Sequence, residues 1–237
     1  MTKQEMRIRP AGDRGVAEFG WLSSRHSFSF GSYYDPEHMG FRSLRVINDD
    51  RVMPGQGFGT HPHRDMEIIS IVVEGALEHK DSMGNGSLIR PGDIQRMTAG
   101  TGVTHSEFNP SQDDEVRFLQ IWIEPETPGL EPGYEQRSFD ASGDRNRWTL
   151  VASRSGRESS VVVHQDVELH RAVIDADSKL TSRIADGRHA WIQVIEGAVE
   201  FDGRTLSKGD GVAMTGVDQL TLTGLAQESD VLLFDLA

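Results

Sequence analysis

The sequence predicts an all-β protein made of two tandem barrels. Its apolar runs are short and rich in β-branched residues, and each one closes at a turn: residues 68–73 end at Glu74-Gly75, and residues 118–123 end at Glu124-Pro125. Short strands separated by glycine-rich turns are typical of β-sandwiches and barrels. The chain has 25 glycines and no long stretch of 3.6-residue periodicity, so few helices are expected. We expect one short helix near residues 175–183.

A repeated β-unit indicates where the second barrel begins. Residues 71–78 and 193–200 share the pattern Glu-Gly-Ala-x-Glu, and a Gly-Asp turn follows each copy, at residues 92–93 and at residues 209–210. Two copies of one unit predict two barrels in tandem. The proline-containing segment 124–147 is a suitable boundary. We therefore expect an N-terminal domain of residues 1–135 and a C-terminal domain of residues 136–237.

Two short motifs in the first copy have the spacing of a metal site. They are His61-Pro62-His63 and His105-Ser106-Glu107. In each motif the outer residues are two apart, so on a strand they lie on the same face. If the two strands are neighbours, His61, His63, His105 and Glu107 converge and can hold a divalent metal with positions left open. Pro62 cannot donate to a sheet ladder, which predicts an edge strand or a bulge at that point.

The second copy has no equivalent ligands. Extending the repeat alignment places His61 on Arg183, His63 on Ala185 and His105 near Leu222. The second barrel is therefore expected to be structural, or to form one wall of a pocket.

Composition excludes several classes of function. The chain has no cysteine, which rules out disulfides, thiolate ligands and a thiol nucleophile. A net charge of −13 disfavours direct binding to nucleic acid or to anionic membranes, but it is compatible with a basic protein partner. The N-terminal segment has no signal-peptide pattern, and no apolar run has membrane-spanning length. We expect a cytoplasmic monomer.

The remaining histidines and Glu67 have more ordinary interpretations. We expect Glu67 either to orient a ligand imidazole or to be a solvated charge on the other face of its strand. His26 lies in an alternating strand and is expected to be a hydrogen-bonded structural residue. The others are expected to be surface or interdomain residues: His38, His79, His164, His170 and His189.

Longer motifs around the metal residues resemble a known family. The patterns Gly-x5-His-x-His-x3-Glu, beginning at Gly55, and Gly-x2-His-x3-Asn, beginning at Gly102, are similar to the two cupin motifs. The strings at residues 57–67 and 98–107, with Tyr33-Tyr34-Asp35-Pro36, resemble the pirin family of bicupins, and most closely the bacterial pirin-like quercetinases. The resemblance covers nearly the whole chain and implies two cupin barrels.

The resemblance also implies a site and an activity. The family's metal ligands match His61, His63, His105 and Glu107, whereas the carboxylate at Glu67, a ligand in many cupins, is not a ligand in pirins. One divalent metal per chain is expected, iron first, with zinc, manganese, nickel, cobalt or copper as alternatives. The implied reaction is dioxygenation of a flavonol such as quercetin with release of carbon monoxide, in which Glu107 could take the substrate hydroxyl proton.

Two other functions remain open at this point. The chain could be a metal- or redox-sensing regulatory protein that binds a protein partner, or a structural bicupin with an incidental metal, because a fold does not fix a function.

Overall fold

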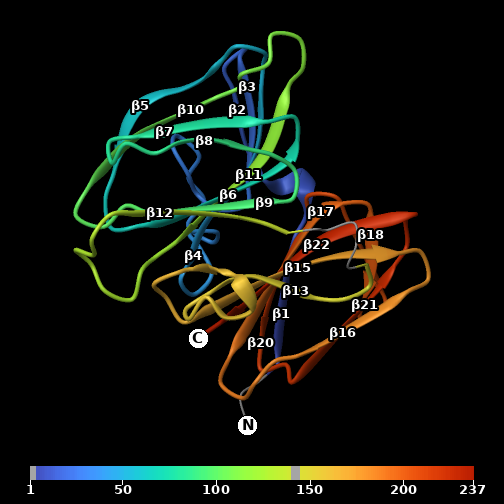
Figure 1. Ribbon diagram of the computed structural model, residues 1–237. Coiled ribbons are helices and arrows are strands. Elements are labelled where there is room, and N and C mark those ends of the chain that lie inside the picture. The colour runs from blue at the N-terminus through green and yellow to red at the C-terminus, as the bar shows by residue number, and fades with distance from the viewer. Residues whose placement is uncertain (1–3, 140–144) are drawn as a thin grey trace. The chain divides into compact units, whose positions relative to one another are not determined.

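The computed structural model describes residues 4–139 and 145–237, which fold into two units rich in β-strands. The first barrel comprises residues 15–139 and 161–165. The second barrel comprises the described parts of residues 1–14, 140–160 and 166–237. The prediction of an all-β chain with two barrels is confirmed. Figure 1 shows the early strand β1 (Glu5–Arg9) among the later strands of the second barrel.

The first barrel consists of a large sheet and a small one. The large sheet contains, in spatial order, β12 (Gly133–Ser138), β9 (Asp93–Thr98), β6 (Glu67–Glu74), β11 (Val116–Ile123), β4 (Leu44–Val52), β3 (Leu22–His26) and β2 (Gly15–Glu18). The small sheet contains β5 (Gly57–His63), β10 (Val103–Phe108), β7 (Leu77–Asp81) and β8 (Gly86–Ile89). The two-residue strand β14 (Val161–Val162) also belongs to this unit.

The second barrel repeats this plan. Its large sheet contains β1, β20 (Gly211–Thr215), β17 (His189–Glu196), β22 (Glu228–Leu236), β15 (Val167–Asp175) and β13 (Thr149–Ser153). Its small sheet contains β16 (Lys179–Arg183), β21 (Gln219–Gly224), β18 (Ala198–Phe201) and β19 (Arg204–Ser207). Short 3₁₀ turns occur at η1 (Ala11–Asp13) and η2 (Arg157–Ser159).

The interiors of the two barrels differ in polarity. In the second barrel, seventeen buried apolar residues form one cluster, which includes Leu180, Phe201, Leu220 and Leu222. In the first barrel, apolar clusters such as the one around Phe118 are accompanied by buried polar side chains on the same strands. These polar residues include Asn48, Asp50, Ser70, His105, Glu107 and Gln120. Because buried polar groups cost free energy unless they are satisfied, such a concentration indicates a functional interior.

The helix expected near residues 175–183 is absent, and that expectation is wrong. The segment contains the end of β15, a turn and β16. Asp177 in the turn has a φ of 62°, and the alternating burial of Lys179–Arg183 follows a two-residue period. Of these five residues only Leu180 is buried, and it faces the core. Its neighbours on either side point to the other face, as the alternation of a strand requires.

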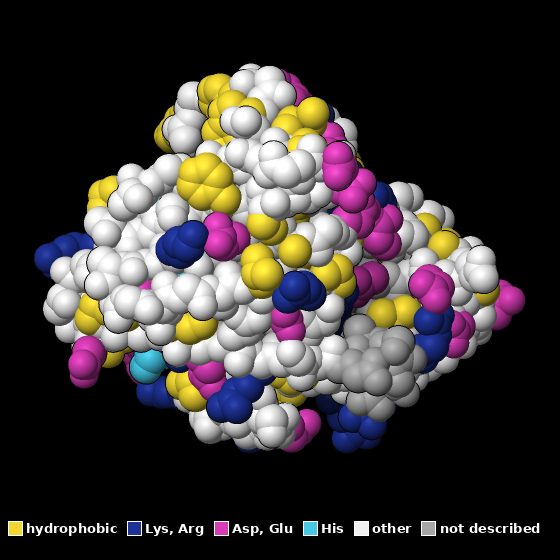
Figure 2. Space-filling view, turned by 45° about the horizontal axis from the view of Figure 1, so that its top comes forward, with side chains coloured by type: hydrophobic (Ala, Val, Ile, Leu, Met, Phe, Trp, Pro, Cys, Tyr) yellow, Lys and Arg dark blue, Asp and Glu magenta, His cyan; other side chains and the backbone are white. Residues whose placement is uncertain are grey.

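The surface carries charges of both signs. In the view of Figure 2, acidic side chains are interspersed with basic ones, and the apolar patches are separated by polar and backbone atoms. No helix among the described residues has the length and apolar character needed to cross a bilayer.

Candidate metal centre

Strands β5 and β10 bring the two histidine motifs together. They pair antiparallel in the small sheet of the first barrel (Figure 1), with His61 opposite His105 and Val103 opposite His63. β5 has β10 as its neighbour and forms the edge of the sheet, where Pro62 is tolerated. The expectation of an edge strand at Pro62 is confirmed.

A β-bulge turns the histidines of β5 toward the interior. Glu107 pairs with Phe58 and His105 pairs with His61, so three steps along β5 match two steps along β10. The extra residue reverses the alternation after Phe58, whose ring packs on the core. His61 and His63 therefore lie on the same face of β5 as Phe58. With strict two-residue alternation they would lie on the opposite face.

The close approach of the two strands depends on Gly57. A Cβ atom built there would lie 2.3 Å from the carbonyl oxygen of Glu107, which is far inside van der Waals contact. Glycine is therefore required by the proximity of the β10 backbone.

The three imidazoles converge on one point. His61, His63 and His105 each offer a nitrogen, and these nitrogens all lie within 4.8 Å of one another. The Nε2 atoms of His61 and His105 are 3.0 Å apart. The ring of His63 packs edge-on against Trp122, with ring centres 5.0 Å apart, which restricts its orientation.

The tautomer of His61 favours a cation at this point. Its Nδ1 lies 2.8 Å from the carbonyl oxygen of Gly59, which can only accept a hydrogen bond. Nδ1 therefore carries the hydrogen, and in a neutral ring Nε2 has a free lone pair directed at His105. The donor set fits a divalent metal bound through imidazole nitrogen.

Burial keeps two of the imidazoles neutral. It lowers the pKa of His63 to about 4, and His61 lowers that pKa further by charge. It lowers the pKa of His105 to about 2, with additional contributions from the charges of His61, His63 and His79. Neutral imidazole is the form that binds metal, so protons do not compete for these two rings near neutral pH.

The carboxylate of Glu107 lies beside the trio of His61, His63 and His105, but its hydrogen bonds are made to other residues. Its buried carboxylate accepts hydrogen bonds from Gln120 Nε2 at 2.8 Å and from Ser70 Oγ at 3.2 Å. It groups with His79 and His105 rather than with His61 and His63. Burial raises the pKa of Glu107 to about 7, although the hydrogen bonds from Gln120 and Ser70 oppose that change. The carboxyl group can therefore gain or lose a proton near neutral pH.

An open cavity of about 560 Å³ adjoins the trio. It is lined by residues of three segments: Pro62, His63, Arg64, Ser82 and 101–104. His63 is thus both part of the trio and part of the cavity wall, while the exposed guanidinium of Arg64 gives the opening a positive charge. The size of the cavity is in the range of small-molecule sites.

His79 was wrongly expected at the surface or between domains. It is completely buried on β7, with its Nδ1 atom 3.5 Å from Nδ1 of His105. Its position depends on His105, which lies on β10, three strands after β7, so no short motif contains both residues. The signal that could have found it is the repeat alignment, which places Phe201 of the second barrel at the same position and so predicts a side chain that points inward.

Glu67 fits neither of its two expected roles. It is fully buried, so it is not a solvated charge, and its Oε2 atom contacts Thr98 Oγ1 at 3.2 Å and the backbone N–H of His164 at 3.2 Å. The imidazole of His164, rather than one of the trio, is its neighbour at 3.3 Å. The structural role of His26 is confirmed, because its buried ring lies 2.7 Å from Asn48 Oδ1.

The second barrel has neither histidine nor carboxylate where the first has its candidate ligands. Glu200 pairs with Thr223 as Glu78 pairs with Phe108, which aligns Leu222 with Glu107 and Leu220 with His105. The sequence alignment, which placed His105 near Leu222, is therefore off by two residues. Ser182, not Arg183, occupies the place of His61, because it faces Leu220.

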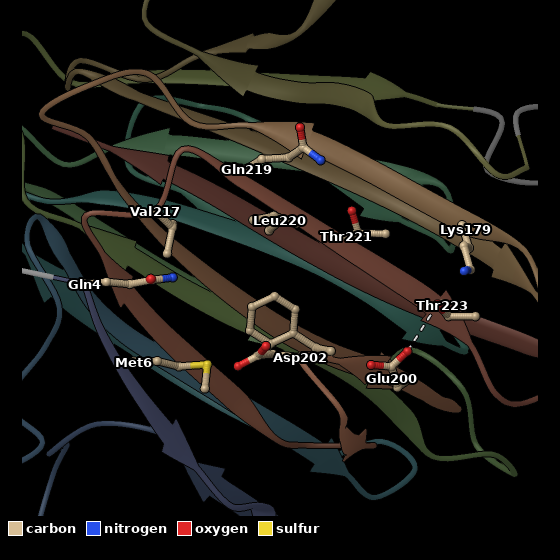
Figure 3. Close-up of a pocket in the computed structure, with 11 residues that line it drawn as sticks. Gln4, Met6, Lys179, Glu200, Asp202, Val217, Gln219, Leu220, Thr221 and Thr223 are labelled. Atoms are coloured by element: carbon tan, nitrogen blue, oxygen red, sulfur yellow. Dashed lines mark hydrogen bonds between the residues drawn. The ribbon is translucent and has the colours of Figure 1, made fainter.

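A cavity of about 530 Å³ in the second barrel contains no histidine (Figure 3). Its polar lining includes Lys179, Glu200 and Asp202, and Thr223 donates a hydrogen bond to Glu200. Within the described residues, the candidate metal-binding groups of three or more ligands lie in the first barrel.

Both halves of the chain match models of known protein families. The model of the Pirin family matches residues 8–123, and the model of the quercetinase C-terminal cupin domain matches residues 150–236. A quercetin 2,3-dioxygenase of Escherichia coli strain K12 is 49% identical over 229 residues, which cover 97% of this chain and 97% of that protein. A putative quercetin 2,3-dioxygenase of Mycobacterium tuberculosis strain H37Rv is 39% identical over 231 residues, which cover 97% of this chain and 94% of that protein.

A solved structure matches the whole fold. The bacterial pirin YhhW from Escherichia coli in complex with nickel(II) superposes with a TM-score of 0.93 at 47% identity, covering 98% of this chain and 99% of that chain.

Proposed function

Because the chain belongs to the pirin family, we propose that it is a metal-dependent quercetin 2,3-dioxygenase. The observation that carries this proposal is the convergence of His61, His63 and His105 beside an open cavity. The names of the relatives supply the substrate class, a flavonol that reacts with O2. The nickel complex of a relative supports one divalent metal per chain.

In the proposed site the ligands are His61, His63, His105 and Glu107. A divalent metal held there would stabilise a deprotonated hydroxyl of the substrate as a Lewis acid. Iron remains our first expectation for the native metal, and elemental analysis of protein purified without a histidine tag identifies it. For Glu107 to be the fourth ligand, one of its oxygens turns from Gln120 or Ser70 toward the trio.

The chain's own residues bind and deprotonate the substrate. The cavity beside His63 accepts the flat polyphenol, and the guanidinium of Arg64 attracts its phenolate form. The carboxylate of Glu107 takes the hydroxyl proton of the substrate. The buried amide of Gln120 holds this carboxylate in place.

Oxygen uptake and carbon monoxide release test the proposal. The protein is loaded in turn with Fe²⁺ or Ni²⁺ and mixed with quercetin. We expect turnover in the wild type, its loss in His61→Ala, and its retention in His189→Ala, a histidine of the second barrel. Glu107→Gln should keep the metal and lose turnover. Absence of turnover with every divalent metal tested would reject the enzyme assignment, and full activity of Glu107→Gln would reject its role as the base.

A further inference from the structure

A buried pair of side chains lies behind the candidate ligand His105. His79 and Asp81 are both on β7, and their side chains are completely shielded from solvent. The Nε2 atom of His79 lies 3.2 Å from Oδ2 of Asp81, and its Nδ1 atom lies 3.5 Å from Nδ1 of His105. Asp81, His79 and His105 thus form a series of contacts that ends where the three imidazoles of the candidate metal centre converge.

Asp81 is fixed as a hydrogen-bond acceptor by the turn that follows β7. Its Oδ1 atom accepts from the backbone N–H groups of Met83 and Asn85 at 2.9 and 3.0 Å, and its Oδ2 atom accepts from Asn85 Nδ2 at 2.9 Å. Although burial opposes it, these bonds and the one from His79 lower the pKa of Asp81. Asp81 is therefore a carboxylate, and the nitrogen of His79 that faces it must carry a hydrogen.

The hydrogen positions along the series of contacts follow from this acceptor. A neutral imidazole has one N–H and one lone pair, so with Nε2–H directed at Asp81, Nδ1 of His79 can only accept. The group that faces it is Nδ1 of His105, which must then donate. Nε2 of His105 is left with its lone pair, and it is this atom that lies 3.0 Å from Nε2 of His61.

We propose that His79 and Asp81 are positioning residues that hold His105 in the tautomer that binds metal through Nε2. This inference rests on the metal site proposed above and adds to it two residues that do not contact the ion. Partners of this kind orient ligand imidazoles and increase their basicity, and their loss typically weakens metal binding about 10–100-fold. The ring of Tyr134, with its centre 5.0 Å from that of His79, packs against this imidazole.

The second barrel provides a suitable substitution. Phe201 occupies the position that His79 has in the first barrel, and it is buried. A phenyl ring is therefore compatible with this strand position, and His79→Phe removes the acceptor while preserving a flat ring. His79→Gln retains an acceptor oxygen. Lys80→Gln, at an exposed neighbour on the same strand, is the matched control.

Two measurements test the proposal. Ni²⁺ affinity is measured by competition with a chelator, and the tautomer of His105 is read from ¹⁵N chemical shifts of histidine-labelled protein without metal and with Zn²⁺. We expect a loss of affinity of about 10–100-fold in His79→Phe, less than about threefold in His79→Gln and none in Lys80→Gln. In the wild type, His105 should be protonated on Nδ1 alone, and in His79→Phe this preference should be lost.

Each contrary result has a distinct meaning. If the wild type binds Ni²⁺ but all variants bind it equally, the positioning role is refuted while the metal site stands. If both His79 variants lose affinity alike and His105 keeps its tautomer, packing rather than hydrogen bonding is responsible, and the proposal fails. A second Ni²⁺ per chain that is lost in His79→Phe would make His79 a ligand and also refute it. Wild-type His105 protonated on Nε2 refutes it without any variant, and a wild type that binds no metal refutes the proposed function instead.

Discussion

Replacement of Asp50 by asparagine should stabilise the metal-free first barrel in alkaline solution. Asp50 is buried on β4, and its Oδ1 atom has no hydrogen-bond partner. Burial raises its pKa from 3.8 to about 7. A hydrogen bond from Ser24 opposes this change, and the negative charges of Glu107 and Asp49 add to it. The folded state therefore binds this proton more tightly than the unfolded chain does.

The sign and the size of the effect follow from this shift. Between pH 4 and pH 7 the unfolded chain has lost the proton while the folded barrel retains it, so stability falls as pH rises. Each pH unit in this range costs about 1.4 kcal/mol, so from pH 5 to pH 7 the loss is about 3 kcal/mol. Above pH 7 the loss is constant. Asparagine has nearly the same shape and no charge to bury, so the variant avoids this loss.

Hydrogen exchange measured in urea isolates the first barrel. Peptides from β4 and β11 give its free energy of opening without contribution from the second barrel, and a chelator removes metal. The stability of Asp50→Asn relative to the wild type should rise by about 3 kcal/mol between pH 5 and pH 8. Asp113→Asn, at an exposed site, is the control and should show no such rise. An equal difference at both pH values would refute the reasoning, as would a variant less stable than the wild type at pH 8.

Two further predictions concern the metal centre itself. At pH 6 the carboxyl group of Glu107, with its pKa of about 7, is mostly protonated, so Ni²⁺ binding through it should release about one proton more than at pH 8. Calorimetry in buffers of different ionisation enthalpy measures this release, and Glu107→Gln should abolish the difference; a variant with unchanged release would show that Glu107 is not a ligand. Gly57→Ala should destabilise the first barrel by about 1–3 kcal/mol and weaken Ni²⁺ binding, because the added methyl group collides with β10. Gly59→Ala, where nothing lies within 4 Å, is its control, and equal stability of the two variants in thermal unfolding would contradict the packing argument.

The sequence was sufficient for the fold class and for the convergence of three histidines. The two-residue period of the motifs placed each pair on one face, and Pro62 indicated the edge of the sheet. The repeat of Glu-Gly-Ala-x-Glu indicated two copies of one unit, which the pairing of Glu78 and Glu200 in their sheets bears out. These features depend on residues that are close together in the chain, so they can be recognised from the sequence alone.

Features that depend on distant pairing were not predictable in this way. His79 acquires its role from His105 on a strand that follows later in the sequence, and β1 joins the second barrel by pairing with β20, more than two hundred residues later. The short helix expected near residues 175–183 is wrong because pairing of β15 and β16 with their neighbours, which are distant in sequence, makes the segment extended. The orientation of the Glu107 carboxylate depends on Ser70 and Gln120, which no motif singles out.

The bulge in β5 has a consequence for how the two halves of the chain can be aligned. The corresponding strand of the second barrel matches its neighbour residue for residue, with Leu180 opposite Leu222 and Ser182 opposite Leu220. Because Ser182 takes the place of His61, and because Leu180, two residues earlier, faces the core, the inward phase of this strand already suits a ligand at Ser182. The extra residue of β5 instead shifts the residues on the N-terminal side of the bulge, so a gap-free alignment of the two halves necessarily mispairs the residues on one side of it.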